Sequence, residues 1–230
     1  MATVLEIVQS VTPRMGIDTP TVLFSSTDRT EQELASTLNE VAQRIGRAHD
    51  WRALKTRIDY TGDGTTAAFA LPDDYGRMPK DGQVWSSRLQ QPLVAIDAEE
   101  NLGHEVRDFE TLTGTWHLAG PSMQFNPVLA DSERASWLYV SRNVGATAAS
   151  APIATFTADT DTFVLDDRLL GLALLAEWRQ IKGLDYAEDL AAAEVALSEL
   201  ISEDKGARIV RQASRRRLDG RMSYPWAITP

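Results

Sequence analysis

The sequence predicts an α+β protein with a four-helix body, an inserted small antiparallel β module and an extended C-terminal tail. Apolar residues recur at helical spacing near both ends of the chain, whereas the middle consists of short apolar runs separated by turn residues. The last 26 residues are rich in arginine. We therefore expect a helical body from residues 1–53 and 165–205, a β module from 54–164 and a docking tail from 206–230.

The first helix is predicted between Thr3 and Val11, before Pro13 and Gly16 end it. Its apolar face consists of Val4, Ile7, Val8 and Val11. A capping box at Thr30-Glu31-Gln32-Glu33 predicts the start of a second helix, which should reach about Ala48. The apolar face of this helix consists of Leu34, Leu38, Val41, Ala42 and Ile45.

From about residue 54, turn residues appear at regular intervals. We expect residues 57–60 and 65–71 to form a hairpin around Thr61-Gly62-Asp63-Gly64, because glycine supplies the positive φ of a hairpin turn. Residues 144–152 are small and predict an exposed loop. Further short strands are predicted at 83–86, 92–96, 114–118, 122–125, 137–141 and 154–156.

Helical periodicity returns at Asp166-Asp167, an acidic start that suits the positive end of a helix dipole. Residues 169–176 are apolar nearly all round, which predicts a central helix. After Lys182-Gly183, a fourth helix opens near Asp185 and should pack against the third as an antiparallel hairpin. Its apolar stripe consists of Tyr186, Leu190, Ala193, Leu197 and Leu200.

The charge is divided unevenly along the chain, whose formal net charge is −10. Residues 205–230 hold seven Lys or Arg and one Asp, whereas the preceding 204 residues hold 16 basic and 32 acidic side chains. An acidic body disfavours tight, sequence-independent binding to nucleic acid, since such binding depends on neutralising phosphates. The chain has no cysteine and, in its sequence, no apolar run of membrane-spanning length, so we expect an intracellular, soluble protein.

Groups suited to catalysis or metal binding are sparse. His49, His104 and His117 lie far apart in the sequence and lack the partners of a metal site. The carboxylate pairs Asp73-Asp74 and Asp166-Asp167 suit a turn and a helix start, and Glu99-Glu100 is a third such pair in an acidic chain. No Gly-Lys-Ser/Thr follows Gly64, so the glycine turn does not match a P-loop. We expect a protein that is not an enzyme, with no cofactor and no metal.

The tail combines arginines with apolar residues, which suits a segment that orders on an acidic protein surface. A mobile, solvated terminus is the alternative interpretation. The residues predicted to dock on a partner are Arg208, Arg211, Arg215, Arg216, Arg217, Tyr224 and Trp226.

Two other functional classes fit parts of the sequence. Residues 31–45 resemble the first half of a helix-turn-helix of a DNA-binding regulator, although a strand-rich stretch follows instead of a basic recognition helix. Trp85, Trp116 and Trp137 could stack on sugars in a carbohydrate-binding or carbohydrate-hydrolysing tail component, but we expect all three in the core.

The order of several short stretches resembles the head-to-tail adaptor (connector) proteins of tailed bacteriophages, the group that includes tail tubular protein A of short-tailed phages. These stretches are residues 3–8, Ser25-Ser26-Thr27-Asp28, His49-Asp50-Trp51 with Leu54, residues 69–75 with Arg77-Met78, and the final helix pair. The tail matches the family least.

The resemblance implies a virion structural protein that forms a ring, usually of twelve copies, beneath the portal protein. Its C-terminal tail would dock on the portal, and its other end would receive the tail tube, nozzle or spike proteins. Double-stranded DNA would pass through the ring without being read during ejection. The protein would be made in the host bacterial cytoplasm and could be a monomer before assembly on the portal.

Overall fold

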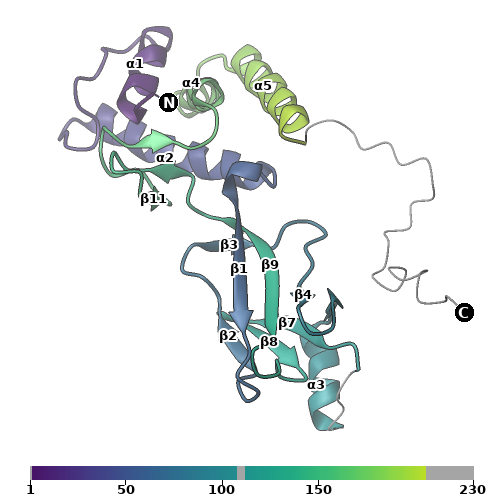
Figure 1. Ribbon diagram of the computed structural model, residues 1–230. Helices are drawn as coiled ribbons and strands as arrows, with labels where there is room; N and C mark the ends of the chain where they lie inside the picture. The colour runs from purple at the N-terminus through teal and green to yellow at the C-terminus, as the bar shows by residue number, and fades with distance from the viewer. Residues whose placement is uncertain (1, 108–111, 206–230) are drawn as a thin grey trace, which may run out of the picture. The chain divides into compact units, whose positions relative to one another are not determined.

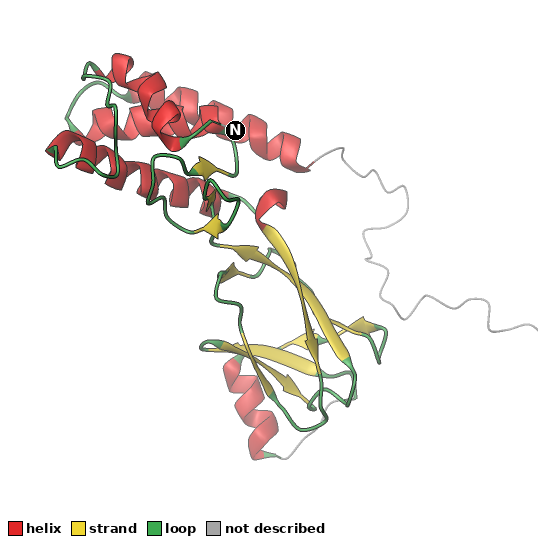
Figure 2. Cartoon of the chain, turned by 60° about the vertical axis from the view of Figure 1, so that its left-hand side comes forward, coloured by secondary structure: helices red, strands yellow, loops and turns green. Residues whose placement is uncertain are grey.

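The computed structural model describes residues 2–107 and 112–205 (Figure 1). These residues form two compact units, one from 2–55 with 141–205 and the other from Thr56–Val140. Figure 2 shows that the long helices belong to the first unit and most of the strands to the second. The predicted α+β class is confirmed.

The first helix, α1 (Val4–Met15), begins with a capping box in which the Thr3 and Glu6 side chains each bind the other residue's backbone N–H. It runs four residues past the predicted end at Val11 and includes Pro13. Proline cannot donate to the Gln9 carbonyl, and the Thr12 hydroxyl donates to that oxygen instead, at 3.2 Å. The helix ends at Gly16, whose φ of 74° is left-handed.

Helix α2 (Arg29–Ala48) starts one residue before the predicted start at Thr30. Its N-cap is Asp28, whose carboxylate accepts from the Thr30 N–H at 2.7 Å, so the cap is not the predicted box. The predicted apolar face is buried throughout. The chain then continues into the short 3₁₀ helix η1 (Arg52–Leu54) and strand β1 (Lys55–Thr61). A strand therefore follows α2, as the sequence predicts, where a helix-turn-helix would have its recognition helix.

Helix α4 (Asp167–Ile181) is the centre of the first unit, as its apolar sequence predicts. Asp166 caps it by accepting from the Leu169 N–H at 2.6 Å. Helices α1, α2 and α5 (Ala187–Lys205) all pack against α4, and the α4–α5 pair forms the predicted hairpin. Leu169, Leu170, Leu174 and Leu175 of α4 are buried.

Residues 141–164 also belong to the first unit. They form a three-stranded sheet in the order β11 (Pro152–Ile153), β10 (Gly145–Ala146) and β12 (Thr162–Phe163). The exposed loop predicted at 144–152 is present in part: residues 148–152 are exposed, whereas Val144 and Gly145 are buried and short strands flank the turn. The strand predicted at 154–156 was wrong, because the strand lies at Pro152–Ile153. The packing around this sheet is close: a Cβ on Gly46 of α2 would lie 2.5 Å from Val144 Cγ1, and a Cβ on Gly145 would lie 2.5 Å from Phe156 Cε1.

The second unit contains two sheets. One has the order β1, β9 (Arg134–Ser141), β4 (Trp85–Ser86) and β5 (Gln91–Pro92), with β3 (Tyr75–Arg77) also paired to β9. The other has the order β2 (Ala68–Ala70), β8 (Ser122–Asn126), β7 (Thr115–Ala119) and β6 (Val94–Ala95). Helix α3 (Ala98–Val106) follows β6 and was not predicted from the sequence. Strands β6 and β7 are parallel, whereas the pairs β2–β8, β7–β8, β4–β5 and β4–β9 are antiparallel.

The predicted hairpin between residues 57–60 and 65–71 does not form, because β1 pairs with β9 and β2 pairs with β8. The intervening loop binds a distant segment: Gly62 N–H donates to the Glu133 carbonyl at 2.7 Å and Gly64 N–H to that of Leu129 at 3.1 Å. Asp63 accepts from the backbone of Thr65 and Thr66, and the Thr66 hydroxyl bond is the main reason its pKa is lowered. The glycines thus serve close packing and an Asx turn.

The core of the second unit is largely aromatic and includes Tyr60, Trp116, Phe125, Trp137 and Tyr139. The prediction of buried tryptophans is confirmed for Trp116 and Trp137 and wrong for Trp85, which is 44% exposed. Trp85 lies opposite Ser136 of β9, so it takes the outer face of the sheet.

Candidate docking surface

The predicted docking residues lie outside the described part of the chain. They are Arg208, Arg211, Arg215, Arg216, Arg217, Tyr224 and Trp226, and all follow α5, which ends at Lys205. The role of these seven residues stays a prediction. The surface that leads to them is described, and it is formed by α5 and its neighbours.

Helix α5 is strongly acidic. It carries Glu188, Asp189, Glu194, Glu199, Glu203 and Asp204 and one basic residue, Lys205. Asp189 is buried and holds the start of α5 in place, since its carboxylate pairs with Arg14 of α1 at 3.1 Å and with Arg179 of α4. Glu188, Glu194, Glu199 and Glu203 are exposed, so α5 presents a negative surface.

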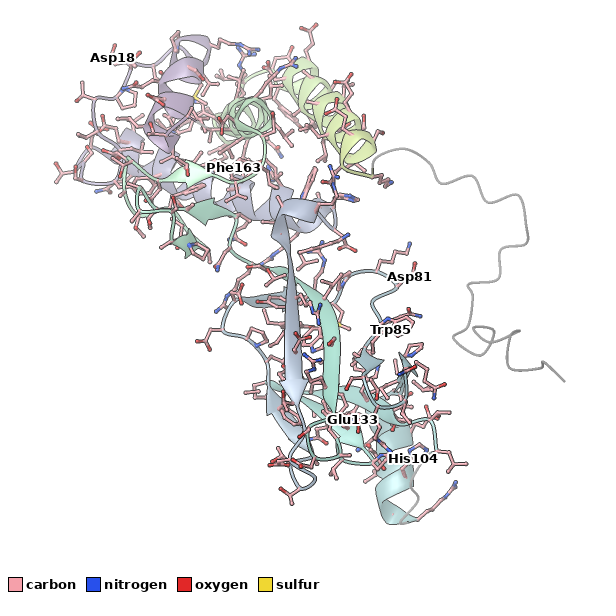
Figure 3. The ribbon with its side chains drawn as sticks, in the orientation of Figure 1. Asp18, Asp81, Trp85, His104, Glu133 and Phe163 are labelled. Atoms are coloured by element: carbon pink, nitrogen blue, oxygen red, sulfur yellow. The ribbon has the colours of Figure 1, made fainter. Side chains whose placement is uncertain are left out.

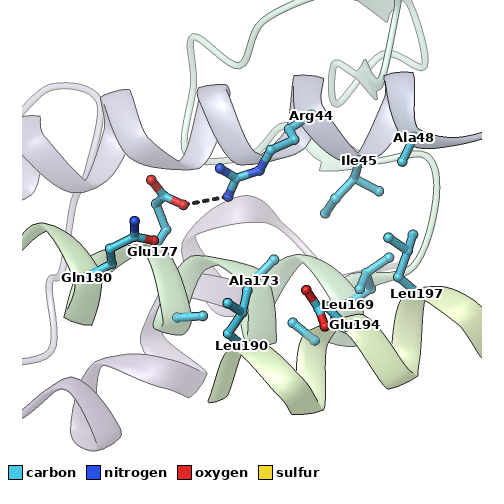
Figure 4. Close-up of a pocket in the computed structure, with 12 residues that line it drawn as sticks. Arg44, Ile45, Ala48, Leu169, Ala173, Glu177, Gln180, Leu190, Glu194 and Leu197 are labelled. Carbon is cyan, nitrogen blue, oxygen red and sulfur yellow. Dashed lines mark hydrogen bonds and ion pairs between the residues drawn. The ribbon is translucent and has the colours of Figure 1, made fainter. Parts of the chain in front are cut away.

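A groove of about 310 Å³ lies between α2, α4 and α5 (Figure 4). We call it the α5 groove. Its lining is Arg44, Ile45 and Ala48 of α2, Leu169, Ala173, Ala176, Glu177 and Gln180 of α4, and Leu190, Ala193, Glu194 and Leu197 of α5. Arg44 and Glu177 form an ion pair at 2.6 Å, which Figure 4 shows at one end of the groove. The remaining lining is mainly aliphatic, with Glu194 beside it.

A second pocket of about 310 Å³ lies at the C-terminal end of α5, and we call it the α5-end pocket. It is lined by Trp51, Arg52, Ala53, Val164, Leu165, Asp166, Leu169, Leu200, Glu203 and Asp204. Leu169 of α4 lines both pockets. Their α5 linings include Ala193, Leu197, Leu200 and Asp204, which recur every three or four residues, so the two pockets lie along the same side of α5.

Asp204 binds the α2–η1 corner to the end of α5. Its carboxylate pairs with His49 Nε2 and with Arg52 Nε, each at 3.3 Å. Trp51 donates from its indole to the Ile45 carbonyl at 2.8 Å and meets the His49 ring edge-on. The sequence pattern did not predict this pocket. The signal available was the apolar stripe of the fourth helix, which is interrupted by carboxylates on the same side.

In the second unit, Glu133 is a buried carboxylate whose burial was not predicted from the sequence. It is only 4% exposed and accepts from the Ser86 hydroxyl, from the Ala130 N–H at 2.9 Å and from Arg88 Nε at 2.8 Å (Figure 3). Burial alone would raise its pKa, but the hydrogen bonds from Ser86 and Ala130 and the Arg88 guanidinium lower it overall from 4.5. The residue joins the β4–β5 turn to the start of β9 and has a structural role.

We expect Glu133→Gln to destabilise the protein by about 1.5–3 kcal/mol at pH 7, because hydrogen bonds to a buried charged group are lost. A carboxyl group whose pKa is lower in the folded state stabilises the fold above its unfolded pKa, and that contribution is lost as the pH falls through the folded pKa. In urea unfolding, the difference in unfolding free energy between wild type and variant should therefore be full at pH 7. It should shrink as the pH falls below the ordinary glutamate value of 4.5 and through the lowered pKa of the folded state. Exposed Glu99→Gln is the matched control; an equal effect there would contradict this role.

The other candidate groups occupy ordinary structural positions. His117 is buried in β7, and His104 lies on α3. Asp74 accepts from the Tyr139 hydroxyl at 2.7 Å, which is one reason, after burial, that the pKa of Tyr139 rises to about 12. Among the described residues, no group of three or more His, Cys, Asp or Glu could hold a metal ion. Within the same residues, no helix is long and apolar enough to cross a membrane.

The sequence was compared with models of known protein families, and one family matches. The sequence model described as SU10 adaptor protein matches residues 2–227, nearly the whole chain. The chain belongs to the SU10 adaptor protein family. The predicted resemblance to phage head-to-tail adaptors is thereby confirmed. No curated protein matches the sequence.

Membership in the SU10 adaptor family implies a bacteriophage structural protein that interacts with other components of the virion. Such adaptors are normally not enzymes. The family match includes both units and continues through Arg208–Arg217 and Trp226. The match to the SU10 adaptor family thus extends over the positions of the tail.

Proposed function

We propose that the protein is a head-to-tail adaptor that forms a ring of twelve copies between the portal and the tail of a phage particle. The observation that carries the proposal is the family match, which extends over the helical unit, the β-rich unit and the basic tail. The ring surrounds the passage through which double-stranded DNA leaves the head. The protein acts by assembly, without catalysis or a cofactor.

The charge distribution suits this role. The first 204 residues carry twice as many acidic as basic side chains, and a negative wall lets a DNA duplex slide past without binding tightly. The positive tail is attracted to acidic protein surfaces, and arginine forms bidentate ion pairs with carboxylates. We therefore assign Arg208, Arg211, Arg215, Arg216 and Arg217 to ion pairs with portal carboxylates. Tyr224 and Trp226 act as aromatic anchors.

In this proposal the two units of the adaptor contact different partners. The helical unit of residues 2–55 and 141–205, with the tail 206–230, faces the portal, and the β-rich unit of residues 56–140 meets tail tube, nozzle or spike proteins. The protein is synthesised in the host bacterial cytoplasm as a monomer, and the ring forms at the head–tail junction of the virion.

Light scattering on the full-length protein, alone and mixed with its portal protein, tests this proposal. The expected result is a single copy alone and a multi-copy complex with the portal, near twelve adaptors per ring. A fixed dimer that binds duplex DNA sequence-specifically at physiological salt would contradict it and favour a transcriptional regulator.

A further inference from the structure

The α5 groove and the α5-end pocket form an apolar surface that the described residues leave open. Leu190 of the groove is 39% exposed, and the groove lining is mainly aliphatic. The α5-end pocket combines apolar side chains, among them Trp51 and Leu200, with charged ones at its edge. Each pocket, at about 310 Å³, has room for one or two large apolar side chains. A surface of this kind suits an extended segment with a few apolar anchors.

The charge around the two pockets favours a basic occupant. The two arginines of the lining are already paired, Arg44 with Glu177 and Arg52 with Asp204. Glu194 at the groove and Glu203 at the α5-end pocket are exposed and add negative charge. Helix α5 as a whole carries six carboxylates against one lysine. The α5 helix of a second copy would bring the same negative charge and would be repelled. Residues 206–230 carry six arginines and one aspartate.

The chain itself continues from the edge of the α5-end pocket. Asp204 lines this pocket and α5 ends at Lys205. Gly206 comes next in the sequence, and glycine readily takes the backbone conformations that a change of chain direction requires. Ile209 and Val210 are the first large apolar residues after Lys205 in the sequence.

The length of the tail is sufficient. From Lys205 back to Ala193 is about 18 Å along the helix axis, at about 1.5 Å per residue. An extended chain covers this distance with about six residues, at about 3.3 Å each. The 25 residues after Lys205 can therefore follow the whole side of α5.

We propose that residues 206–230 fold back along α5 of the same chain and occupy the two pockets while the adaptor is free. Ile209 and Val210 fill the α5-end pocket. The arginines between Arg211 and Arg217 then lie against Glu203 and Glu194. This contact within one chain does not depend on portal docking, and its test requires no portal.

The absence of cysteine from the chain permits clean site-specific labelling. Spin labels are placed on Glu40→Cys, an exposed position of α2, and on Ser214→Cys in the tail of the full-length protein. Pulsed dipolar spectroscopy should show one narrow distance distribution. With Glu194→Lys and Glu203→Lys added, the narrow peak should be lost, because the charge that holds the arginines is reversed.

The matched control carries Glu188→Lys and Glu199→Lys, which make the same charge change on the same helix but line neither pocket. It should retain the narrow peak, and circular dichroism checks that both double variants are folded. A broad distribution in the starting protein, or equal loss in both double variants, would overturn the proposal. A dipolar signal between mixed singly labelled chains would overturn it too, since it would place a second copy in the groove.

Discussion

Replacing Arg215, Arg216 and Arg217 together with glutamate is expected to lower the yield of infectious particles by a factor of about 10³ or more. Loss of one partner of a buried charge pair at an interface costs about 2–5 kcal/mol, and about 1.4 kcal/mol corresponds to a tenfold loss of affinity. In the proposed ring every copy carries the same change, so the defect is repeated around the junction. The measurement is plaque complementation of a phage that lacks the gene.

The matched control reverses three exposed arginines of the helical unit, Arg29, Arg47 and Arg168. It should lower the yield far less, since surface pairs contribute little. Electron microscopy should show DNA-filled heads without tails only for the tail variant. Deleting residues 207–230 should have the same effect while leaving a folded protein. If the truncated form still yields infectious particles, the docking role of the tail is wrong.

Leu174→Ala is expected to destabilise the helical unit by about 2–5 kcal/mol, because it opens a cavity where three helices pack on α4. Leu174 is fully buried, and α1, α2 and α5 all contact this helix. Urea denaturation followed by far-ultraviolet circular dichroism measures the loss.

Leu184→Ala is the matched control for this prediction. Leu184 lies in the α4–α5 connection and is 50% exposed, so the same truncation there should cost less than about 1 kcal/mol. Equal losses for the two variants would contradict the central position of α4.

The helices could be predicted from the sequence because their signals are local. Helical spacing identified the buried faces of α1, α2 and α4, and the apolar run 169–176 identified the central helix. The errors at their ends have local causes as well. The Thr12 hydroxyl lets α1 continue past Pro13, and Asp28 caps α2 before the predicted box begins.

Strand pairing could not be predicted because it depends on residues distant in the sequence. A glycine-rich turn between two short strands favours a hairpin, yet the loop around Gly62 binds residues 129–133 and the two strands join different sheets. The position of Trp85 depends on its register opposite Ser136, which no local pattern fixes. For the same reason the sequence did not indicate the buried Glu133.

The docking surface was predictable only in part. The basic tail is visible in the composition, whereas the α5 groove requires α2 to lie beside α5, which is a tertiary arrangement. The acidic carboxylates of α5 could be read in the sequence, but their position next to aliphatic pockets could not. The structure therefore shows a negative, partly apolar surface on α5, the helix that precedes the basic tail in the sequence.

Imaging of the phage particle with a label on this protein tests the central claim most directly. A label fused to the chain and seen by electron microscopy should lie at the junction between head and tail, as a ring on the axis beneath the portal. A label on the capsid shell or at the tip of a tail fibre would contradict the account. Its absence from purified, infectious particles would contradict it as well.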